Sequence, residues 1–374
     1  MTRQPFSEHE FDVVRMHKCG AVGMMANMGI EVPELEPIYN RSVSEKENWK
    51  LFFEERNPYW KPVNGCIGSD VNIFRPRINP DNAALLIVYD GEEPVVTYDG
   101  EHALLHSDWF DTDWLFVPAT GGSMTAPGSP KFVDMNDWRD VVSIPNLDDL
   151  PWEGFGERNR EYLDTTQYNQ LGVSCLLFER MMALMDVENA VVALIDEDQR
   201  EAMHDFLNEV ADFVIDYINR VCDSCNIDGV VVCDDWGHQE NSFFSLDTAM
   251  EVFVPYLKRI VDAVHARGMF CELHSCGKNE GLVPAFEAAG IDLWCPQDIN
   301  DIDKMLEMYP DAHISYGDTL IDVAPDATEE EQVAAAEAWF DKYKDKRVVC
   351  AFLNGTPTIE RTIYRLSREY YTED

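Results

Sequence analysis

Met269-Phe-Cys-Glu-Leu-His-Ser-Cys-Gly277 is the stretch around which the rest of this chain can be interpreted. Its apolar run up to Leu273 is typical of a buried parallel strand, and polar residues follow at the carboxyl end. Side chains alternate faces along a strand, so His274 and Cys276 are predicted on one face, about 6.6 Å apart. An imidazole and a thiolate placed in this way supply two ligands for zinc, which needs a third from the protein. On spacing alone, a buried thiol beside a hydrogen-bonded histidine is an equally good interpretation.

A second strand of the same kind lies upstream, in Asp228-Gly-Val-Val-Val-Cys-Asp-Asp-Trp-Gly237. It ends in two acidic residues, Asp234 and Asp235. Between the two strands, an amphipathic helix is predicted from an N-cap at Ser245 to a stop at Gly268. The result is a strand–helix–strand unit in which each strand ends in candidate site residues.

These motifs resemble the uroporphyrinogen decarboxylase superfamily. The resemblance lies in the Asp-Asp-Trp-Gly strand end, in the Phe-Val-Pro-Tyr-Leu-Lys-Arg segment of the helix and in the His-Ser-Cys-Gly strand end. It extends from about residue 108 to the C-terminus. The superfamily also contains zinc-dependent methyltransferases that work with corrinoid (cobalamin) proteins. The resemblance implies an α/β fold, a single (β/α)8 TIM-type barrel over 1–374. Residues 1–150 would supply N-terminal helices, lid loops and early strands, and 151–374 the main βα repeats.

The alternation of apolar strands and amphipathic helices becomes regular after Leu171 and predicts six strands from there on. We place the first of them at 173–178. Eight strands would then require two from the N-terminal third, where 83–89, 94–98 and 114–118 have strand-like composition. The first 60 residues are predicted to be helical and irregular.

In a barrel of this type, active sites lie at the carboxyl ends of the strands. Ligand-type and polar residues collect at those predicted ends, above apolar strands. Each of them taken singly has a structural explanation, such as a turn cap or a local ion pair. Together they indicate a site, whose catalytic candidates are Glu179, Arg180, Asp234, Asp235 and Gln297.

The metal ligands that the resemblance implies are His-x-Cys and a distant cysteine on a late strand. His274 and Cys276 match the first two, and Cys350 is the preferred third, although the Gly-Cys turn of the family is absent around it. Cys295 on the neighbouring strand is the rival, and a site without metal stays open. Two thiolates would nearly cancel the charge of Zn²⁺ and leave a fourth position for a thiol, methoxyl or methylthio substrate.

Composition excludes several classes of function. Lys and Arg number 29 against 70 Asp and Glu, a net charge of -41, which disfavours nucleic acids and anionic membranes. No apolar run approaches the ~20 residues of a membrane span. Ten scattered cysteines suit a reducing cytoplasm better than a disulfide framework.

The function expected from the sequence is therefore zinc-dependent methyl transfer between a small methylated compound and a corrinoid protein. Uroporphyrinogen decarboxylation itself is rejected, because the family's Arg-Gln-Ala-Gly-Arg motif is absent near the N-terminus and a chain at -41 suits a polyanion poorly. Two alternatives remain open. One is a metal-free decarboxylase or lyase of a small carboxylate with Arg180 as the anion clamp, and the other is a non-catalytic binding protein.

Overall fold

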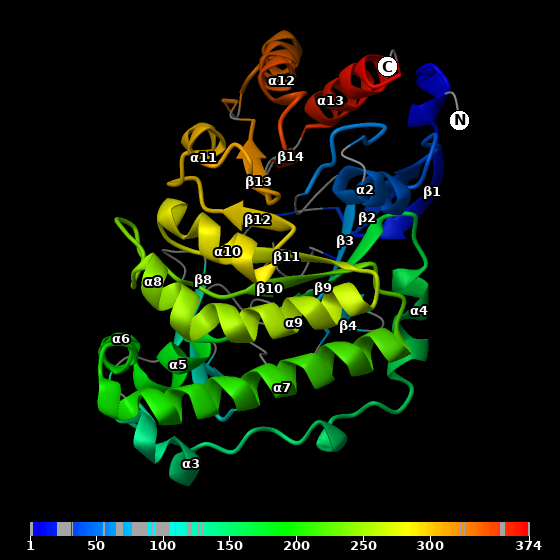
Figure 1. Cartoon of the computed structure of the whole chain (residues 1–374). Helices are drawn as coiled ribbons and strands as arrows, with labels where there is room; N and C mark the ends of the chain where they lie inside the picture. Colours follow the sequence, from blue (N-terminus) through cyan, green and yellow to red (C-terminus); the bar gives the residue numbers. More distant parts are fainter. Residues whose placement is uncertain are drawn as a thin grey trace.

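The fold is described from a computed structural model of the chain (Figure 1). The residues it describes are 3–20, 31, 33–54, 57–64, 70–76, 89–90, 93–94, 105–108, 110–117, 122–125, 128, 130–321, 323–324, 326–351 and 356–372.

A parallel sheet of seven strands forms the centre of the molecule, in the order β14-β13-β12-β11-β10-β9-β3. Its strands are short and almost wholly buried, because helices cover one face and the other face turns inward. Along the chain they are β3 (Val71–Phe74), β9 (Tyr168–Val173), β10 (Gly229–Cys233), β11 (Phe270–Ser275), β12 (Leu293–Pro296), β13 (Ser315–Leu320) and β14 (Val348–Ala351).

The sheet is curled so that its two ends approach each other. Val63 makes a parallel bridge to Cys350 on β14, and the amide of Asp70, just before β3, donates to the Val63 carbonyl. Val71 and Val349, from the strands at opposite ends of the order, belong to the same inner core cluster. The sheet is thus curled as in a TIM-type barrel, and the described residues do not form a complete ring of eight paired strands.

Helices between successive strands pack on the outer face of the sheet (Figure 1). The largest cluster of buried apolar residues lies between these helices and the strands. The N-cap predicted at Ser245 is confirmed, since its side chain accepts the backbone N–H of Thr248. Thr328 caps α12 in the same way, as part of a capping box. None of the described helices is long and apolar enough to cross a membrane. The longer covering helices are α5 (Phe178–Met185), α7 (Arg200–Ser224), α9 (Val254–Ala266), α10 (Val283–Ala289), α12 (Glu329–Tyr343) and α13 (Pro357–Tyr370).

Shorter helical segments complete the connections. A π-helical turn, Ala249–Phe253, joins α8 to α9, so the predicted continuous helix is irregular near its start. The remaining segments are α3 (Trp138–Val141), α4 (Phe155–Leu163), α6 (Val187–Ala193), α8 (Leu246–Thr248) and α11 (Ile302–Met308), with single turns at Glu8–Phe11, Met135–Asp137, Leu147–Asp149, Glu197–Gln199 and Glu280–Leu282.

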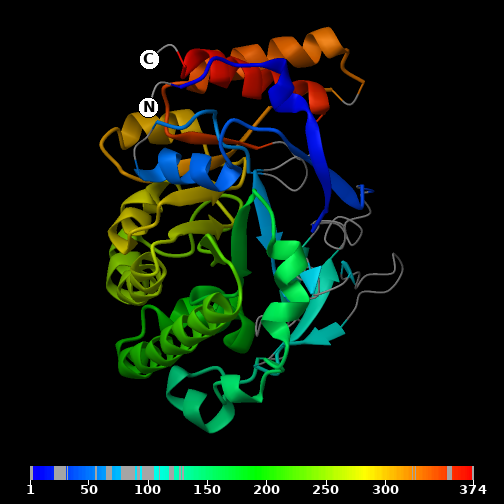
Figure 2. The same ribbon diagram turned by 90° about the vertical axis from the view of Figure 1, so that its right-hand side faces the viewer.

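The N-terminal third differs from its prediction. The described part of the first 60 residues contains helix, as expected, in α2 and in a single turn at Glu8–Phe11, and also an antiparallel pair of strands, β1 and β2, which was not expected. The expected strands 83–89 and 94–98 lie mostly outside the described residues, and the expected strand 114–118 is confirmed as β7. Figure 2 shows these antiparallel pieces on the side away from α7 and α9. The elements are β1 (Val13–Lys18), β2 (Leu35–Tyr39), α2 (Glu45–Glu54), β4 (Tyr89–Asp90), β5 (Glu93–Pro94), β6 (Leu105–Ser107), β7 (Asp113–Val117) and β8 (Gly122–Thr125).

The first strand of the regular repeat was placed too far along the chain. The predicted strand 173–178 is in fact the end of β9, a sharp turn with Cys175 at φ 59°, and the start of α5. The apolar residues 176–178 fill the core beneath that turn instead of extending the strand. Glu179 and Arg180 therefore lie in the first turn of a helix and not at a strand end. The six-strand count after Leu171 holds, with β9 as the first.

An ion pair links the N-terminal segment to the last helix, and the two termini lie close together in Figures 1 and 2. The guanidinium of Arg368 on α13 donates to both carboxylate oxygens of Glu10, at 2.9 and 3.2 Å, and its side chain is fully buried. Burial opposes the ionisation of Glu10, but hydrogen bonds from Arg368 and Tyr364 lower its pKa overall. Because the folded-state pKa is depressed, this stabilisation is present above the unfolded-state pKa of Glu10 and is lost as the pH falls through the folded value.

Arg368→Met should lower the free energy of unfolding by about 3–5 kcal/mol, because it leaves the buried Glu10 carboxylate without its cation. Urea unfolding at pH 7 measures the loss. Arg365→Met, on the same helix at a position without an ion pair among the described residues, is the matched control and should change stability little. Equal losses in the two variants would contradict the anchoring role of the ion pair.

Candidate metal centre

The inward face of the curled sheet is polar in its middle. Glu272 on β11 lies there fully enclosed and accepts hydrogen bonds from Gln170 at 2.6 Å and from Asn64 at 3.2 Å. The thiol of Cys295 on β12 also donates to it, at 3.0 Å. Burial raises the pKa of Glu272, and these donors act in the opposite direction. His274, two residues further along β11, faces the same side, one step nearer the carboxyl end.

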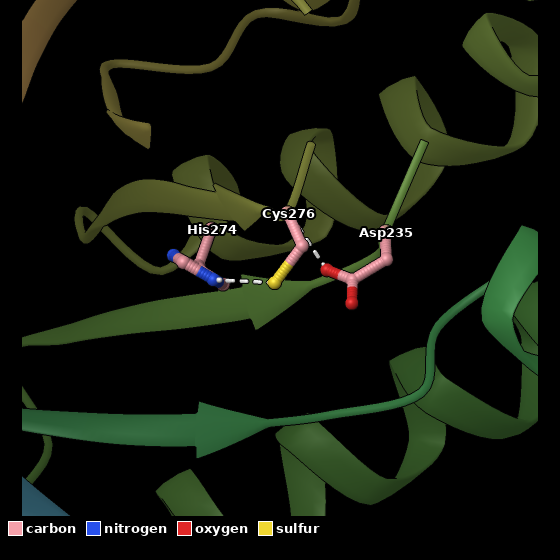
Figure 3. A group of neighbouring side chains, drawn as sticks. All are labelled: Asp235, His274 and Cys276. Atoms are coloured by element: carbon pink, nitrogen blue, oxygen red, sulfur yellow. Dashed lines mark hydrogen bonds between the residues drawn. The ribbon is translucent and has the colours of Figure 1, made fainter. Parts of the chain in front are cut away.

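His274, Cys276 and Asp235 meet at the carboxyl ends of β10 and β11 (Figure 3). The Nε2 atom of His274 lies 3.3 Å from the Sγ atom of Cys276. One carboxylate oxygen of Asp235 accepts the backbone N–H of Cys276 at 2.7 Å. One ligand atom from each residue lies within 4.8 Å of the other two, and this is the one such group of three among the described residues.

Two glycines allow the ends of β10 and β11 to come so close. Gly277 has a φ of 88°, and a Cβ at this position would lie 2.0 Å from the backbone carbon of Gly237. The loop after Cys276 therefore rests directly on the loop after Asp235. The amide of Gly277 donates to the side-chain oxygen of Gln297 at 2.8 Å, so Gln297 holds this loop from the β12 side.

The protonation of the histidine is set by its second nitrogen. Nδ1 of His274 lies 3.0 Å from the carbonyl oxygen of Cys295, an acceptor, so Nδ1 carries the proton. The lone pair of Nε2 then faces Cys276, which is how histidine ligands are usually oriented. A main-chain carbonyl, rather than the carboxylate of Asp234 or Asp235, thus orients the ring.

The donor set fits a zinc ion. Tetrahedral coordination at 2.0–2.3 Å places ligand atoms roughly 3.3–3.8 Å apart. The 3.3 Å between Nε2 of His274 and Sγ of Cys276 lies in this range, and the Asp235 carboxylate is within 4.8 Å of both atoms. Burial, followed by the charges of Asp235 and Glu179, raises the pKa of Cys276 far above its usual range. A thiol in such surroundings ionises when a cation is bound beside it. The three groups would present one nitrogen, one sulfur and one oxygen and leave a fourth position open.

Asp234, predicted as a catalytic candidate, is fully buried, and its carboxylate accepts hydrogen bonds that stabilise the local fold. It accepts the backbone N–H groups of residues 177, 178 and 179 at 2.8–3.2 Å, and the indole of Trp236 at 2.7 Å. Burial raises its pKa to about 6. Asp234 thus ties the turn before α5 to the end of β10. Glu179 accepts the amide of Cys175 at 3.2 Å and lies close enough to raise the pKa of Cys276.

Arg180 has its partners inside the protein, outside the cluster of His274, Cys276 and Asp235. Its fully buried guanidinium forms an ion pair with Asp108 at 2.5 Å and lies 4.0 Å from the ring centre of Phe110. Asp108 also accepts the indole of Trp114 at 2.9 Å. The structure therefore gives Arg180 a partner inside the protein, which the anion-clamp hypothesis did not anticipate.

The structure does not bring Cys350 to His274 and Cys276. On β14 the side chain of Val349 belongs to the inner cluster, so its neighbour Cys350 faces the outer core, near Lys61 and Asp70. Cys295 faces inward, but its thiol points to Glu272. Asp235 occupies the position that the sequence analysis assigned to a third cysteine.

Comparison with known proteins supports the sequence-based resemblance. The family model of uroporphyrinogen decarboxylase (URO-D) matches residues 176–318. The resemblance to this superfamily is confirmed. The matched stretch contains Asp235, His274 and Cys276, so all three residues of the metal centre lie in the URO-D-like part of the chain. No curated protein matches the chain significantly.

Two solved structures are similar to this chain to different extents. A methyltransferase from Methanosarcina mazei is similar with a TM-score of 0.55 and 14% identity, over 88% of this chain and 99% of that one. A B12-independent methionine synthase from Shewanella sp. W3-18-1 matches with a TM-score of 0.38 and 11% identity, over 66% and 70% of the two chains. At 14% identity, the methyltransferase shows that the fold is shared.

The sequence analysis missed two inward-facing groups. Asn64 and Arg75 come from the N-terminal part, where the strands are short and interrupted and no periodic pattern was evident. A signal existed for Glu272, because a glutamate inside an otherwise apolar run must find hydrogen-bond donors when the strand is buried.

Arg180→Met should lower the free energy of unfolding by about 3–5 kcal/mol, because Asp108 is then a buried charge without its partner. The double variant Arg180→Met/Asp108→Leu should recover part of the loss. Urea unfolding curves of the three proteins measure both effects. A variant that is as stable as the parent but binds substrate more weakly would return Arg180 to the list of substrate-binding candidates.

Proposed function

We propose that this protein is a zinc-dependent methyltransferase that moves a methyl group between a small methylated compound and a corrinoid protein. The observation that carries the proposal is the cluster of His274, Cys276 and Asp235 at the carboxyl ends of parallel strands. Active sites of barrel-type α/β proteins lie at this edge of the sheet. The URO-D family match and the fold shared with a protein described as a methyltransferase support the same conclusion.

Each residue of the centre has a distinct task. His274 offers Nε2, because Nδ1 is committed to a carbonyl. The Cys276 thiolate and the Asp235 carboxylate together supply two negative charges against the two positive charges of the ion. Bound there, zinc would act as a weak Lewis acid that stabilises the oxygen or sulfur from which the methyl group departs. Gln297 and the Gly237–Gly277 contact keep the cluster in place while the fourth position stays accessible.

The acidic residues next to the cluster are candidates for proton transfer in the reaction. Glu179 is half-buried and acts electrostatically on Cys276. We infer that Glu179 carries a proton and delivers it to the group that is left after the methyl group has been removed. Asp234, which is engaged by four donors, is a positioning residue in this scheme.

The alternatives have less support. A metal-free lyase would need an anion clamp at Arg180, which is paired with Asp108 in the structure. A non-catalytic binding protein would have no use for a histidine whose lone pair is aimed at a half-buried thiol.

Zinc content tests the ligand set. Cys276→Ser should lower zinc affinity by more than about 100-fold, since it replaces a thiolate by a neutral hydroxyl. Asp235→Asn should weaken binding less, because an amide oxygen can still coordinate. Zinc is measured by elemental analysis after dialysis, and affinities by competition with a chelator.

Cys350→Ser and Cys295→Ser are the matched controls, because both change a buried cysteine outside the cluster. Both should retain zinc. Loss of zinc in Cys350→Ser together with full retention in Asp235→Asn would restore Cys350 as the third ligand. A parent protein that takes up no zinc, even after growth with added metal, would end the metalloenzyme proposal.

The transfer itself is visible by spectroscopy. A corrinoid protein encoded near this gene, reduced to the cobalt(I) state, should change its absorbance when this protein and a methoxyl or methylthio compound are added. His274→Ala should abolish the change. The methyltransferase proposal fails if no neighbouring corrinoid protein responds to methoxyl, methylthio or thiol substrates.

A further inference from the structure

Arg75 lies on the inward face of the sheet, where no carboxylate of the described residues forms an ion pair with it. Arg75 directly follows β3, whose last residue, Phe74, pairs with Leu171 on β9. Its guanidinium donates to the hydroxyl of Ser174 at 2.9 Å and approaches the thiol of Cys233 at 3.8 Å. Among the described residues, none places a carboxylate oxygen within ion-pair distance of it.

The fold makes room for this side chain. It lies across β9 at Gly172, where a Cβ would be 2.4 Å from Nε and 2.7 Å from Cγ of Arg75. Any side chain larger than hydrogen at position 172 would therefore displace the arginine. The glycine lets a residue from the end strand of the sheet reach the third strand, where it contacts Cys233.

Arg75 is close to the metal centre. Cys233 pairs in register with His274 on the adjacent strand, and it is close enough to Cys276 to contribute to the raised pKa of that thiol. Ser174, directly after β9, and His274 on β11 are two strand spacings apart, roughly 10 Å. A compound that places an anionic group at Arg75 and its methyl group at the metal centre must bridge about this distance, as a substituted aromatic acid does.

The charges around Arg75 indicate that the partner of its guanidinium is a bound anionic ligand. A half-buried guanidinium is costly when unpaired, and its planar donors match a carboxylate in two parallel hydrogen bonds. Asp235, Glu179 and Glu272 surround this region, so an anionic ligand would be repelled unless a cation received it. In a chain of net charge -41, Arg75 is the cation positioned to do so.

We propose that Arg75, supported by Ser174, binds a carboxylate of the methylated substrate, so that the substrate class is methoxyl- or methylthio-substituted carboxylic acids. This assignment rests on the proposed methyltransferase function for the reacting end of the molecule. The carboxylate end is argued from Arg75, Gly172 and Ser174 alone.

A matched pair of ligands tests the assignment without any turnover. The probes are 4-methoxybenzoate and 4-methoxybenzamide, which differ in charge but hardly in shape, and binding is measured by calorimetry and by the shift in melting temperature. The parent should bind the carboxylate more tightly than the amide. Arg75→Gln should weaken carboxylate binding about 10- to 100-fold and leave amide binding unchanged. Arg75→Lys should fall in between, since it keeps the charge but not the planar donors.

Gly172→Ala should reproduce the effect of Arg75→Gln, because it displaces the arginine without changing any charge. Arg158→Gln, an exposed arginine on α4, controls for the loss of one positive charge and should not alter the preference. Thermal unfolding of each variant verifies that it is folded.

The proposal is overturned if the parent binds amide and carboxylate equally, if it binds neither, or if Arg75→Gln keeps the full preference. Arg75 would then serve to balance the buried carboxylates. The methyltransferase proposal is judged separately, because it can fail in the cobalt assay while carboxylate binding and its dependence on Arg75 persist.

Discussion

The close approach of Gly237 and Gly277 is the constraint on which the candidate site depends. Parallel strands deliver their side chains to a common edge, but the loops that leave that edge normally diverge. Here the two backbones touch, since a Cβ on Gly277 would lie 2.0 Å from the carbon of Gly237. The amide of Cys276 consequently reaches the Asp235 carboxylate. Without this contact, His274 and Cys276 would still share a face of β11, but the oxygen ligand from β10 would not complete the group.

Side chains alternate between the two faces of the sheet, so neighbouring residues on a strand have different roles. Asp235 turns toward the cluster, while Asp234 receives the amides before α5 and stays buried. Val349 turns inward and Cys350 outward on β14 by the same rule. A shift of one residue along a strand moves a side chain to the other face of the sheet. The spacing of residues within one strand does not indicate which face a side chain of a distant strand occupies. This is why His274 and Cys276 could be paired from the sequence, and the position of Asp235 beside them could not be predicted.

The accuracy of the sequence analysis followed the strength of the local signal. From β10 onward, apolar strands are separated by capped amphipathic helices, and the strands, their order and the resemblance to the URO-D superfamily were predictable. Around Leu176 to Phe178 the apolar run belongs to a turn and a helix start, and composition cannot distinguish these from a strand. β3 has four residues, too few for a periodic pattern, so the position of Arg75 depended on tertiary pairing with β9.

The buried charges of the inner face form one electrostatic system rather than separate features. Glu272 is held by neutral donors from three elements, and the metal centre adds a carboxylate and a thiol above it. Removing these groups from water is unfavourable unless positive charge accompanies them. Arg75 supplies one such charge from the side of β3, and a bound divalent ion would supply two at the carboxyl ends of β10 and β11. A cation at each of these two places on the inner face would let a strongly acidic protein receive an anionic substrate. The same arrangement would direct the carboxylate to Arg75 and the methyl-bearing atom to the open position beside His274.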